Sequence, residues 1–257
     1  MPDRQTLSLD EYLALPMPDL QWVVPGLIPT QSFTILWGPP KSGKTLLSLQ
    51  FALAIASGTP LVGYSPIRRS VLFVELDTGQ RLFRCALSSV VSHTTPGALL
   101  RLPNPESLAA QYPLNLLTEP SQLYLHTLIS ETQPSLVIVD CLSELAHHDE
   151  NEQKEVKPVV AALKHLTVFH PLYPCACLLL HHTVKFDYQN KQTPLPSPLK
   201  AGRGSGYLAG AADSVWFLHR LTSDQDPHAV LKIVPRFAQP QTLYLKQGLG
   251  GLWTRTA

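Results

Sequence analysis

Residues 32–57 read SFTILWGPPKSGKTLLSLQFALAIAS, and this stretch decides the fold class. It opens with an apolar run, 32–37, that has the length and composition of a buried strand, and it closes with an apolar helical run, 45–57. The eight residues between them, GPPKSGKT, match the pattern G-x-x-x-x-G-K-[ST]. A strand, this loop and a helix in that order predict a phosphate-binding loop.

The residue types in this loop have physical reasons. Glycines let the backbone curl so that its N–H groups point at phosphate oxygens, and the start of the helix adds positive potential. We expect Lys44 to reach the β- and γ-phosphates and the Thr45 hydroxyl to bind Mg²⁺. ATP and Mg²⁺ are therefore the predicted ligands, with nucleotide contacts from Gly38, Pro39, Pro40, Lys41, Ser42, Gly43, Lys44, Thr45 and Leu46.

Outward from the loop, apolar strand-like runs alternate with helical patterns. Strands are predicted at 70–76, 135–140 and 175–182, and helices at 80–92, 121–132 and 155–169. Strands without polar alternation are buried on both faces, as in a parallel sheet flanked by helices. The runs at 214–220, 229–234 and 242–245 have no helices between them, and 247–251 has the composition of a turn. We predict an α/β fold with a mostly parallel central sheet and antiparallel C-terminal strands.

Acidic residues follow two of the predicted strands. Asp140 ends the run SLVIVD, at the edge where ligands bind in open α/β sheets, and we expect it to hold Mg²⁺. Glu75 and Asp77 end the run SVLFVELD and share one face of that strand. Either acid is a candidate base for the attacking water, and Asp77 is the preferred one.

Composition excludes several other classes. The 257 residues carry a formal net charge of +1, which does not fit a protein that coats duplex DNA with its whole surface. No apolar run reaches the roughly 18 residues that a membrane span needs. The four cysteines fit neither a disulfide framework nor a C-x-x-C site, and no histidines have H-x-x-x-H spacing beside a glutamate. We therefore expect a cytoplasmic protein without membrane association, and the histidine spacing does not predict a zinc site.

The chain resembles the RecA-like P-loop ATPases of the RepA type and their AAA_25 relatives, which are allied with DnaB and KaiC-like proteins. The resemblance covers roughly residues 20–245 and is carried by WVVPGLIPTQSFTILWGPPKSGKT, VLFVELD, LVIVD, LLLHHTVK and GRGSGYLAGAADSVWFL. It implies a RecA-like ATPase core at 33–257. Residues 1–32 carry a short amphipathic stretch followed by four prolines, and we expect them to form an adaptor segment that wraps the core. The resemblance also implies a homo-oligomer, in the form of a hexameric ring.

The resemblance assigns roles to matching positions. The acid aligned with Asp77 polarises the hydrolytic water and is a glutamate in most relatives, so the side chain here is one methylene shorter. Asp140 matches the aspartate that coordinates Mg²⁺. His182 matches the polar sensor that contacts the γ-phosphate, with His181 as its substitute.

Two arginines match residues that relatives direct at a nucleotide, often across a subunit boundary. They are Arg203 in GRGSG and Arg236 in VPRF. Relatives tend to have Lys-x-Arg at the second place, whereas the lysine position here is Val234 and Lys232 lies one strand step away. An arginine that neutralises charge on the transferred phosphate raises the rate of transfer by about 10³ or more.

Residues 186–202 have no periodicity and precede the GRGSG turn. In the RecA-like group this loop faces the ring pore and contacts single-stranded DNA. The residue types that suit phosphate contacts and base stacking there are Lys185, Tyr188, Lys191 and Lys200.

The sequence is compatible with two functions. The first is an ATP-dependent oligomeric motor on single-stranded DNA, a helicase or translocase. The alternative is a slow ATPase that acts as a nucleotide-dependent assembly switch or as an accessory protein in recombination or replication, without unwinding. A small-molecule phosphotransferase is disfavoured because the sequence offers no arginine-rich lid.

Overall fold

A single sheet dominates the computed structural model, which describes residues 6–16, 20–91, 98–111, 113–145, 153–183, 197–202, 206–223, 225–236 and 238–256. Along one half of the sheet, in spatial order, lie β3 (Phe33–Gly38), β7 (Ala176–His182), β6 (Leu136–Asp140), β4 (Val71–Glu75) and β5 (Leu100–Arg101). The other half continues from β3 through β8 (Ser214–Arg220), β9 (His228–Pro235), β10 (Gln241–Gln247) and β11 (Trp253–Arg255).

The sheet changes from parallel to antiparallel at β8. Strand β3 is parallel to both of its neighbours, β7 and β8, and the parallel pairing continues through β6, β4 and β5. Strands β9, β10 and β11 then add as antiparallel neighbours. The predicted fold class is thereby confirmed. The register pairs Gly38 with His182 and Glu75 with Asp140, so the carboxyl ends of these four strands share one edge of the sheet.

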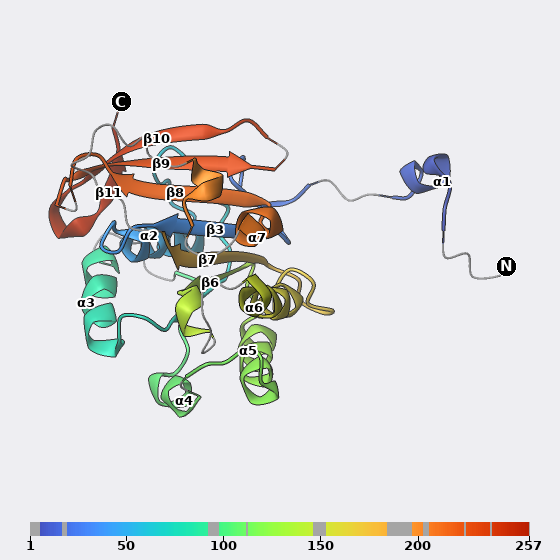
Figure 1. The fold of residues 1–257 in the computed structure, drawn as a ribbon. Coiled ribbons are helices and arrows are strands. Elements are labelled where there is room, and N and C mark those ends of the chain that lie inside the picture. Colours follow the sequence, from blue (N-terminus) through green and yellow to red (C-terminus); the bar gives the residue numbers. More distant parts are fainter. Residues whose placement is uncertain are drawn as a thin grey trace.

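Helices cover both faces of the sheet (Figure 1). One face packs against α2 (Lys44–Ser57), α3 (Gln80–Val91) and the hairpin of β1 (Trp22–Val24) and β2 (Ile28–Pro29). The other face packs against α5 (Glu119–Thr132), α6 (Gln153–Leu166) and α7 (Gly206–Ala211). Shorter elements complete the chain: α4 (Pro105–Ala110) and the 3-10 turns η1 (Leu142–Glu144), η2 (Pro198–Lys200) and η3 (Leu249–Gly251).

Alternation along β3 explains why the sheet has two cores. Leu36 points to the side of α2, where it joins a cluster with Phe51 and Trp216. Ile35 and Trp37 point to the side of α5 and α6. All six residues of β3 are buried, as expected for a strand covered on both faces. Among the described helices, none combines the length and the apolar character that crossing a bilayer requires.

The N-terminal segment has two parts that differ in burial. Val23 and Ile28 of the β1–β2 hairpin are buried and belong to the core. Helix α1 (Leu9–Leu13) is closed by a capping box between Ser8 and Glu11 but buries none of its residues. Figure 1 shows α1 well apart from the sheet and its helices. The hairpin thus packs on the core, whereas α1 does not.

Candidate functional site

The loop after β3 has a conformation that requires glycine at two positions. Gly43 has φ +95°, and a Cβ there would lie 2.7 Å from the indole ring of Trp253. A Cβ on Gly38 would lie 2.3 Å from the carbonyl oxygen of Leu218 on the neighbouring β8. The backbone therefore fits only without side chains at these two points. The result is a tight turn that leads directly into the first turn of α2.

Lys44 is buried inside this turn, with 6% of its surface exposed. Its Nζ donates hydrogen bonds to the carbonyl oxygens of Gly38 (3.0 Å) and Pro39 (3.1 Å). Burial lowers the pKa of the Lys44 ammonium, while the neighbouring Asp140 opposes that shift. The amine is thus held over the loop by carbonyl groups, at the place where phosphate oxygens can replace them as acceptors.

Thr45 and Asp140 meet beside Lys44. The Thr45 hydroxyl donates a 2.6 Å hydrogen bond to Oδ2 of Asp140, and Asp140 is 2% exposed. Burial raises the pKa of Asp140 to about 6; the Thr45 hydrogen bond and Lys44 lower it, and the nearby acids Asp77 and Glu75 raise it further. A hydroxyl and a carboxylate at this separation are the oxygen donors that Mg²⁺ takes beside a nucleotide. The pair therefore fits a Mg²⁺ site.

We predict that Asp140→Asn stabilises the ligand-free protein above about pH 6 while weakening Mg²⁺ binding. Folding raises the Asp140 pKa from 3.8 to about 6, so the folded state holds this proton more tightly and loses stability as the pH rises across that interval. The amide removes this cost and still accepts the Thr45 hydrogen bond. We expect about 3 kcal/mol more unfolding free energy by urea denaturation. Below pH 3.8 the two proteins should be equally stable; an advantage that persists there would contradict this account.

The two candidate bases, Glu75 and Asp77, differ in burial. Glu75 is 9% exposed, its Oε1 accepts a hydrogen bond from the Thr78 N–H, and burial raises its pKa. Its side chain lines an apolar cavity of about 430 Å³ between α3 and α4. Asp77, two residues later, is exposed. Both acids line a neighbouring cavity of about 380 Å³, but of the two only Asp77 also lines the cavity beside Lys44. The geometry therefore favours Asp77 as the acid that faces a bound nucleotide.

A cavity of about 280 Å³ joins the predicted residues at the carboxyl ends of the strands. It is lined by the loop and the start of α2, by side chains that end β6 and β7 or follow β4, and by two from the antiparallel part of the sheet. These residues are Lys41, Gly43, Lys44, Thr45, Leu46, Asp77, Asp140, His182, Arg220 and Gln247. The buried Ser42 Oγ in the same loop has no hydrogen-bond partner among the described residues. An orphaned hydroxyl, a buried ammonium and loop N–H groups suit a triphosphate.

Two residues of the cavity wall, Arg220 and Gln247, were not predicted from the sequence, nor was Trp253, which contacts the loop. Trp253 on β11 donates from Nε1 to the Gly43 carbonyl (3.3 Å) and exchanges two hydrogen bonds with Gln50 of α2 (2.7 and 3.2 Å). Arg220 lies over the Trp253 ring, 5.2 Å from its centroid, and its Nη2 donates to Oε1 of Gln247 (2.7 Å). The antiparallel strands thus support the loop and bring a guanidinium to the cavity. The one available signal was that Arg220 ends the strand next to β3.

Arg236 lies at the opposite edge of the sheet from this cavity. It follows β9, whose Pro235 pairs with Ser214 at the amino end of β8. Its Nη2 donates to the carbonyl oxygens of Gly210 (2.7 Å) and Ala212 (3.0 Å), and its Nε lies 3.7 Å from Oδ1 of Asp213. Within one chain, Arg236 therefore holds the end of α7 and does not reach the nucleotide cavity.

The other predicted residues either lie outside the described part of the chain or differ in whether they reach the cavity. Arg203, Lys185, Tyr188 and Lys191 lie outside the described residues. Lys200 is exposed in η2 and is not among the residues that line the cavity. His181 is buried within β7, whereas His182 reaches the cavity. Of the histidine pair, His182 is therefore the one placed to contact a phosphate.

Comparison with known proteins places this geometry in a family. The AAA_25 family, described as an AAA domain, matches residues 2–187. None of the curated proteins matches the chain in sequence. Among solved structures, the ATPase domain of G40P is 15% identical with a TM-score of 0.62, over 88% of this chain and 85% of that one. The RadB recombinase is 16% identical with a TM-score of 0.56, over 89% and 92%.

A DnaB-like replicative helicase is similar over a smaller part of its own length. It is 14% identical with a TM-score of 0.60, and the match covers 88% of this chain but 57% of that chain. At such identities the structural likeness establishes the fold alone. The family match spans well over half of the 257 residues and agrees with that fold. The chain therefore belongs to the AAA_25 family and has the RecA-like fold of the P-loop ATPases.

Proposed function

We propose that this protein is an ATP-dependent oligomeric motor that acts on single-stranded DNA. Support for hydrolysis comes from the cavity, which joins a phosphate-binding loop, a Thr45–Asp140 pair and an exposed acid, Asp77. Support for movement comes from the chain segment that directly follows the cavity residue His182. The replicative helicase and the recombinase among the similar structures are related by fold, and the action on DNA is our inference.

In the proposed mechanism, the loop N–H groups and Lys44 bind the β- and γ-phosphates, exchanging the carbonyl contacts of Lys44 for phosphate oxygens. Thr45 and Asp140 would hold Mg²⁺, which supplies charge neutralisation on the phosphates. Asp77 orients the attacking water and accepts its proton. His182 donates a hydrogen bond to a γ-phosphate oxygen, and this contact is lost when the phosphate leaves.

The motor proposal rests on the short connection between the cavity and residues 186–202, the loop proposed to contact DNA. Thr183 directly follows His182 and forms an antiparallel bridge with Gly202. A Cβ at Gly202 would lie 2.2 Å from the Trp37 ring, so this anchor packs tightly on β3. Thr183 and Gly202, which flank residues 184–201, are therefore held together next to the cavity residue His182. A change in the contact of His182 with the γ-phosphate moves one of these anchors directly.

Support for an oligomer comes from helix α1. Its Leu9, Tyr12 and Leu13 are 73%, 58% and 70% exposed, and they lie on a short capped helix that stands apart from the core (Figure 1). Apolar side chains on a projecting helix are stabilised when another surface covers them. We propose that a neighbouring copy supplies that surface in a hexameric ring. In such a ring Arg203 or Arg236 would act on the nucleotide of the adjacent subunit.

One observation favours the alternative of a slow nucleotide-dependent switch. The guanidinium of Arg236 already donates hydrogen bonds to two carbonyl groups of its own chain and forms an ion pair with Asp213. An arginine held in this way contributes to a neighbouring nucleotide only after these contacts break. Together with the short side chain of Asp77, this arrangement would give slow turnover that controls assembly without unwinding DNA.

Two measurements test the motor. We expect ATP hydrolysis by the purified protein to rise several-fold when a single-stranded oligonucleotide is added, because Thr183, next to the segment proposed to contact DNA, directly follows His182. Native mass spectrometry should show subunits assembling with ATP and the oligonucleotide joining the assembly. Hydrolysis and assembly that ignore DNA would support the switch instead. A protein that stays monomeric and does not hydrolyse ATP would overturn both functions.

A further inference from the structure

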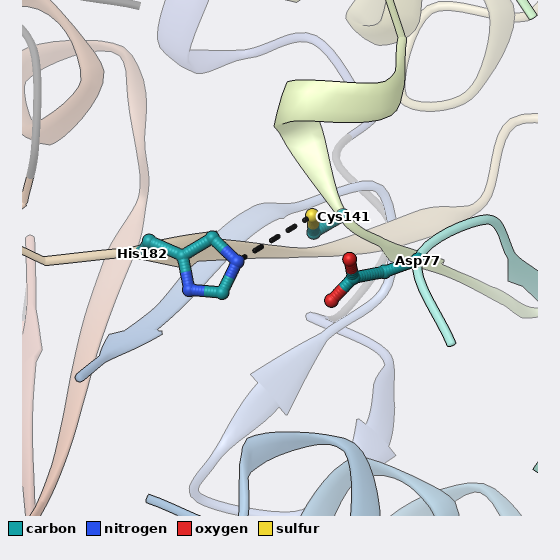
Figure 2. A group of neighbouring side chains, drawn as sticks. All are labelled: Asp77, Cys141 and His182. Carbon is teal, nitrogen blue, oxygen red and sulfur yellow. Dashed lines mark hydrogen bonds between the residues drawn. The ribbon is translucent and has the colours of Figure 1, made fainter. Parts of the chain in front are cut away.

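Three side chains with different donor atoms converge at the edge of the nucleotide cavity. Asp77 follows β4, Cys141 follows β6 and His182 ends β7, and these strands are consecutive in the sheet. One ligand-type atom from each residue lies within 4.8 Å of the others. Figure 2 shows the imidazole Nε2, the thiol sulfur and the carboxylate directed toward one another. Since they come from three separate strand ends, no spacing in the sequence reveals them.

The geometry is close to that of a tetrahedral metal site. Nε2 of His182 lies 3.9 Å from Sγ of Cys141. With Zn–S and Zn–N bonds of about 2.3 and 2.1 Å, tetrahedral ligands lie about 3.5 Å apart. A contraction of a few tenths of an ångström brings this pair to that separation. The exposed Asp77 is free of the core packing that fixes the other two, so its rotation can supply the carboxylate oxygen.

We propose that Asp77, Cys141 and His182 form an inhibitory site for a thiophilic divalent cation, with Zn²⁺ as the best-suited ion. As the metal binds, the Cys141 thiol releases its proton to water, a sulfur–metal bond forms, and His182 and Asp77 supply nitrogen and oxygen ligands. The fourth position faces the cavity and takes a water molecule. Mg²⁺ does not compete for this site because it prefers an octahedron of oxygen ligands.

The surroundings of Cys141 suit reversible binding. Its sulfur lies 2.8 Å from the hydroxyl of Ser143, which orients it, and the thiol is fully buried. Structural zinc sites use four protein ligands, whereas the described residues bring together three here. The site should therefore bind when free metal rises and release it when chelators are present.

Inhibition is the regulatory consequence, and this part rests on the proposed function. Asp77 bound to a cation can no longer accept a proton from the attacking water. His182 bound through Nε2 can no longer donate from that atom to a γ-phosphate. A single ion would thus remove two groups of the hydrolytic site while leaving Lys44, Thr45 and Asp140 in place for the nucleotide.

Binding is tested first, without any measurement of activity. Co²⁺ replaces Zn²⁺ in tetrahedral sites and gives a thiolate charge-transfer band in the near ultraviolet. We expect one equivalent of Co²⁺ to produce this band in the ligand-free protein and Zn²⁺ to abolish it. The band should disappear in Cys141→Ser and persist in the matched control Cys85→Ser, because Cys85 is an exposed cysteine on α3 outside the cluster.

Two further variants test the other ligands. Asp77→Asn and His182→Ala retain the thiolate, so they should retain the band but require more Co²⁺ to reach it. A protein without the band, or a band that survives in Cys141→Ser, would overturn the site. These outcomes do not depend on hydrolysis, so they remain distinct from failure of the proposed function.

Regulation is then tested with ATP and excess Mg²⁺. We expect added Zn²⁺ to reduce hydrolysis at least tenfold in the Cys85→Ser control, and a chelator to restore it, since general-base catalysis contributes about 10²–10⁴ in rate. Cys141→Ser should keep its rate when Zn²⁺ is added. Metal binding through Cys141 that leaves hydrolysis unchanged would refute the inhibitory role.

Discussion

Asp77→Asn should reduce kcat for ATP hydrolysis by about 10²–10³, the range that a positioned general base contributes, with little change in KM. The reason is that Asp77 is the exposed acid that lines the cavity beside Lys44, whereas it makes no packing contact that the nucleotide needs for binding. Asparagine keeps the size of the side chain but cannot accept the proton. Steady-state phosphate release, with nucleotide affinity measured separately by calorimetry, checks both halves of this expectation.

Glu75→Gln is the matched control. Its amide oxygen can still accept the hydrogen bond that Glu75 takes from the Thr78 N–H, so the turn after β4 is preserved. Turnover should stay within a few-fold of the wild-type value. The reverse pattern, with full turnover in Asp77→Asn and loss in Glu75→Gln, would transfer the base role to Glu75.

Lys44→Ala should raise the Kd for ATP by about 100-fold, because a charged hydrogen-bond donor to phosphate is worth about 1.5–3 kcal/mol and Lys44 has two bonds to exchange. The same substitution should not unfold the protein, since burial already disfavours the charged amine in the ligand-free state. Calorimetric titration with ATP, alongside thermal unfolding of the ligand-free variant, measures the two effects.

Lys41→Ala provides the comparison within the same loop. Lys41 also lines the cavity, but it is exposed, and water screens its charge. We expect a loss of affinity below about tenfold for this variant. Equal losses for Lys41→Ala and Lys44→Ala would show that net positive charge, and not the buried position of Lys44, determines binding.

The parallel half of the sheet could be predicted because each of its elements carries a local signal. Residues 33–38 and 136–140 are continuous apolar runs, and such runs in alternation with helices have few other solutions. Boundaries were less accurate. The helix predicted at 155–169 is α6, which starts at Gln153 and ends at Leu166, and Pro158 therefore lies beyond its first turn. At that position its missing N–H removes one backbone hydrogen bond from the helix, a cost that a proline in the first turn would not have.

The site could be predicted only where function and local pattern coincide. Lys44, Thr45 and Asp140 are found because a loop pattern and a strand end mark them. Arg220 at the cavity and Trp253 against Gly43 carry no such mark, since their positions depend on how β8 and β11 are placed by the rest of the sheet. The convergence of Cys141 with His182 depends on strand order in the same way. Long-range packing of this kind is not encoded in short windows of sequence.

The contact between Trp253 and Gly43 joins residues 210 positions apart in the chain. Contacts of such separation form late, since closing a long loop costs conformational entropy before any contact repays it. We therefore expect the phosphate-binding turn to reach its final conformation only when this contact forms, in one of the slowest steps of refolding. During refolding, nucleotide binding should recover more slowly than the helical circular dichroism signal. An early intermediate would contain the helices but would not bind ATP.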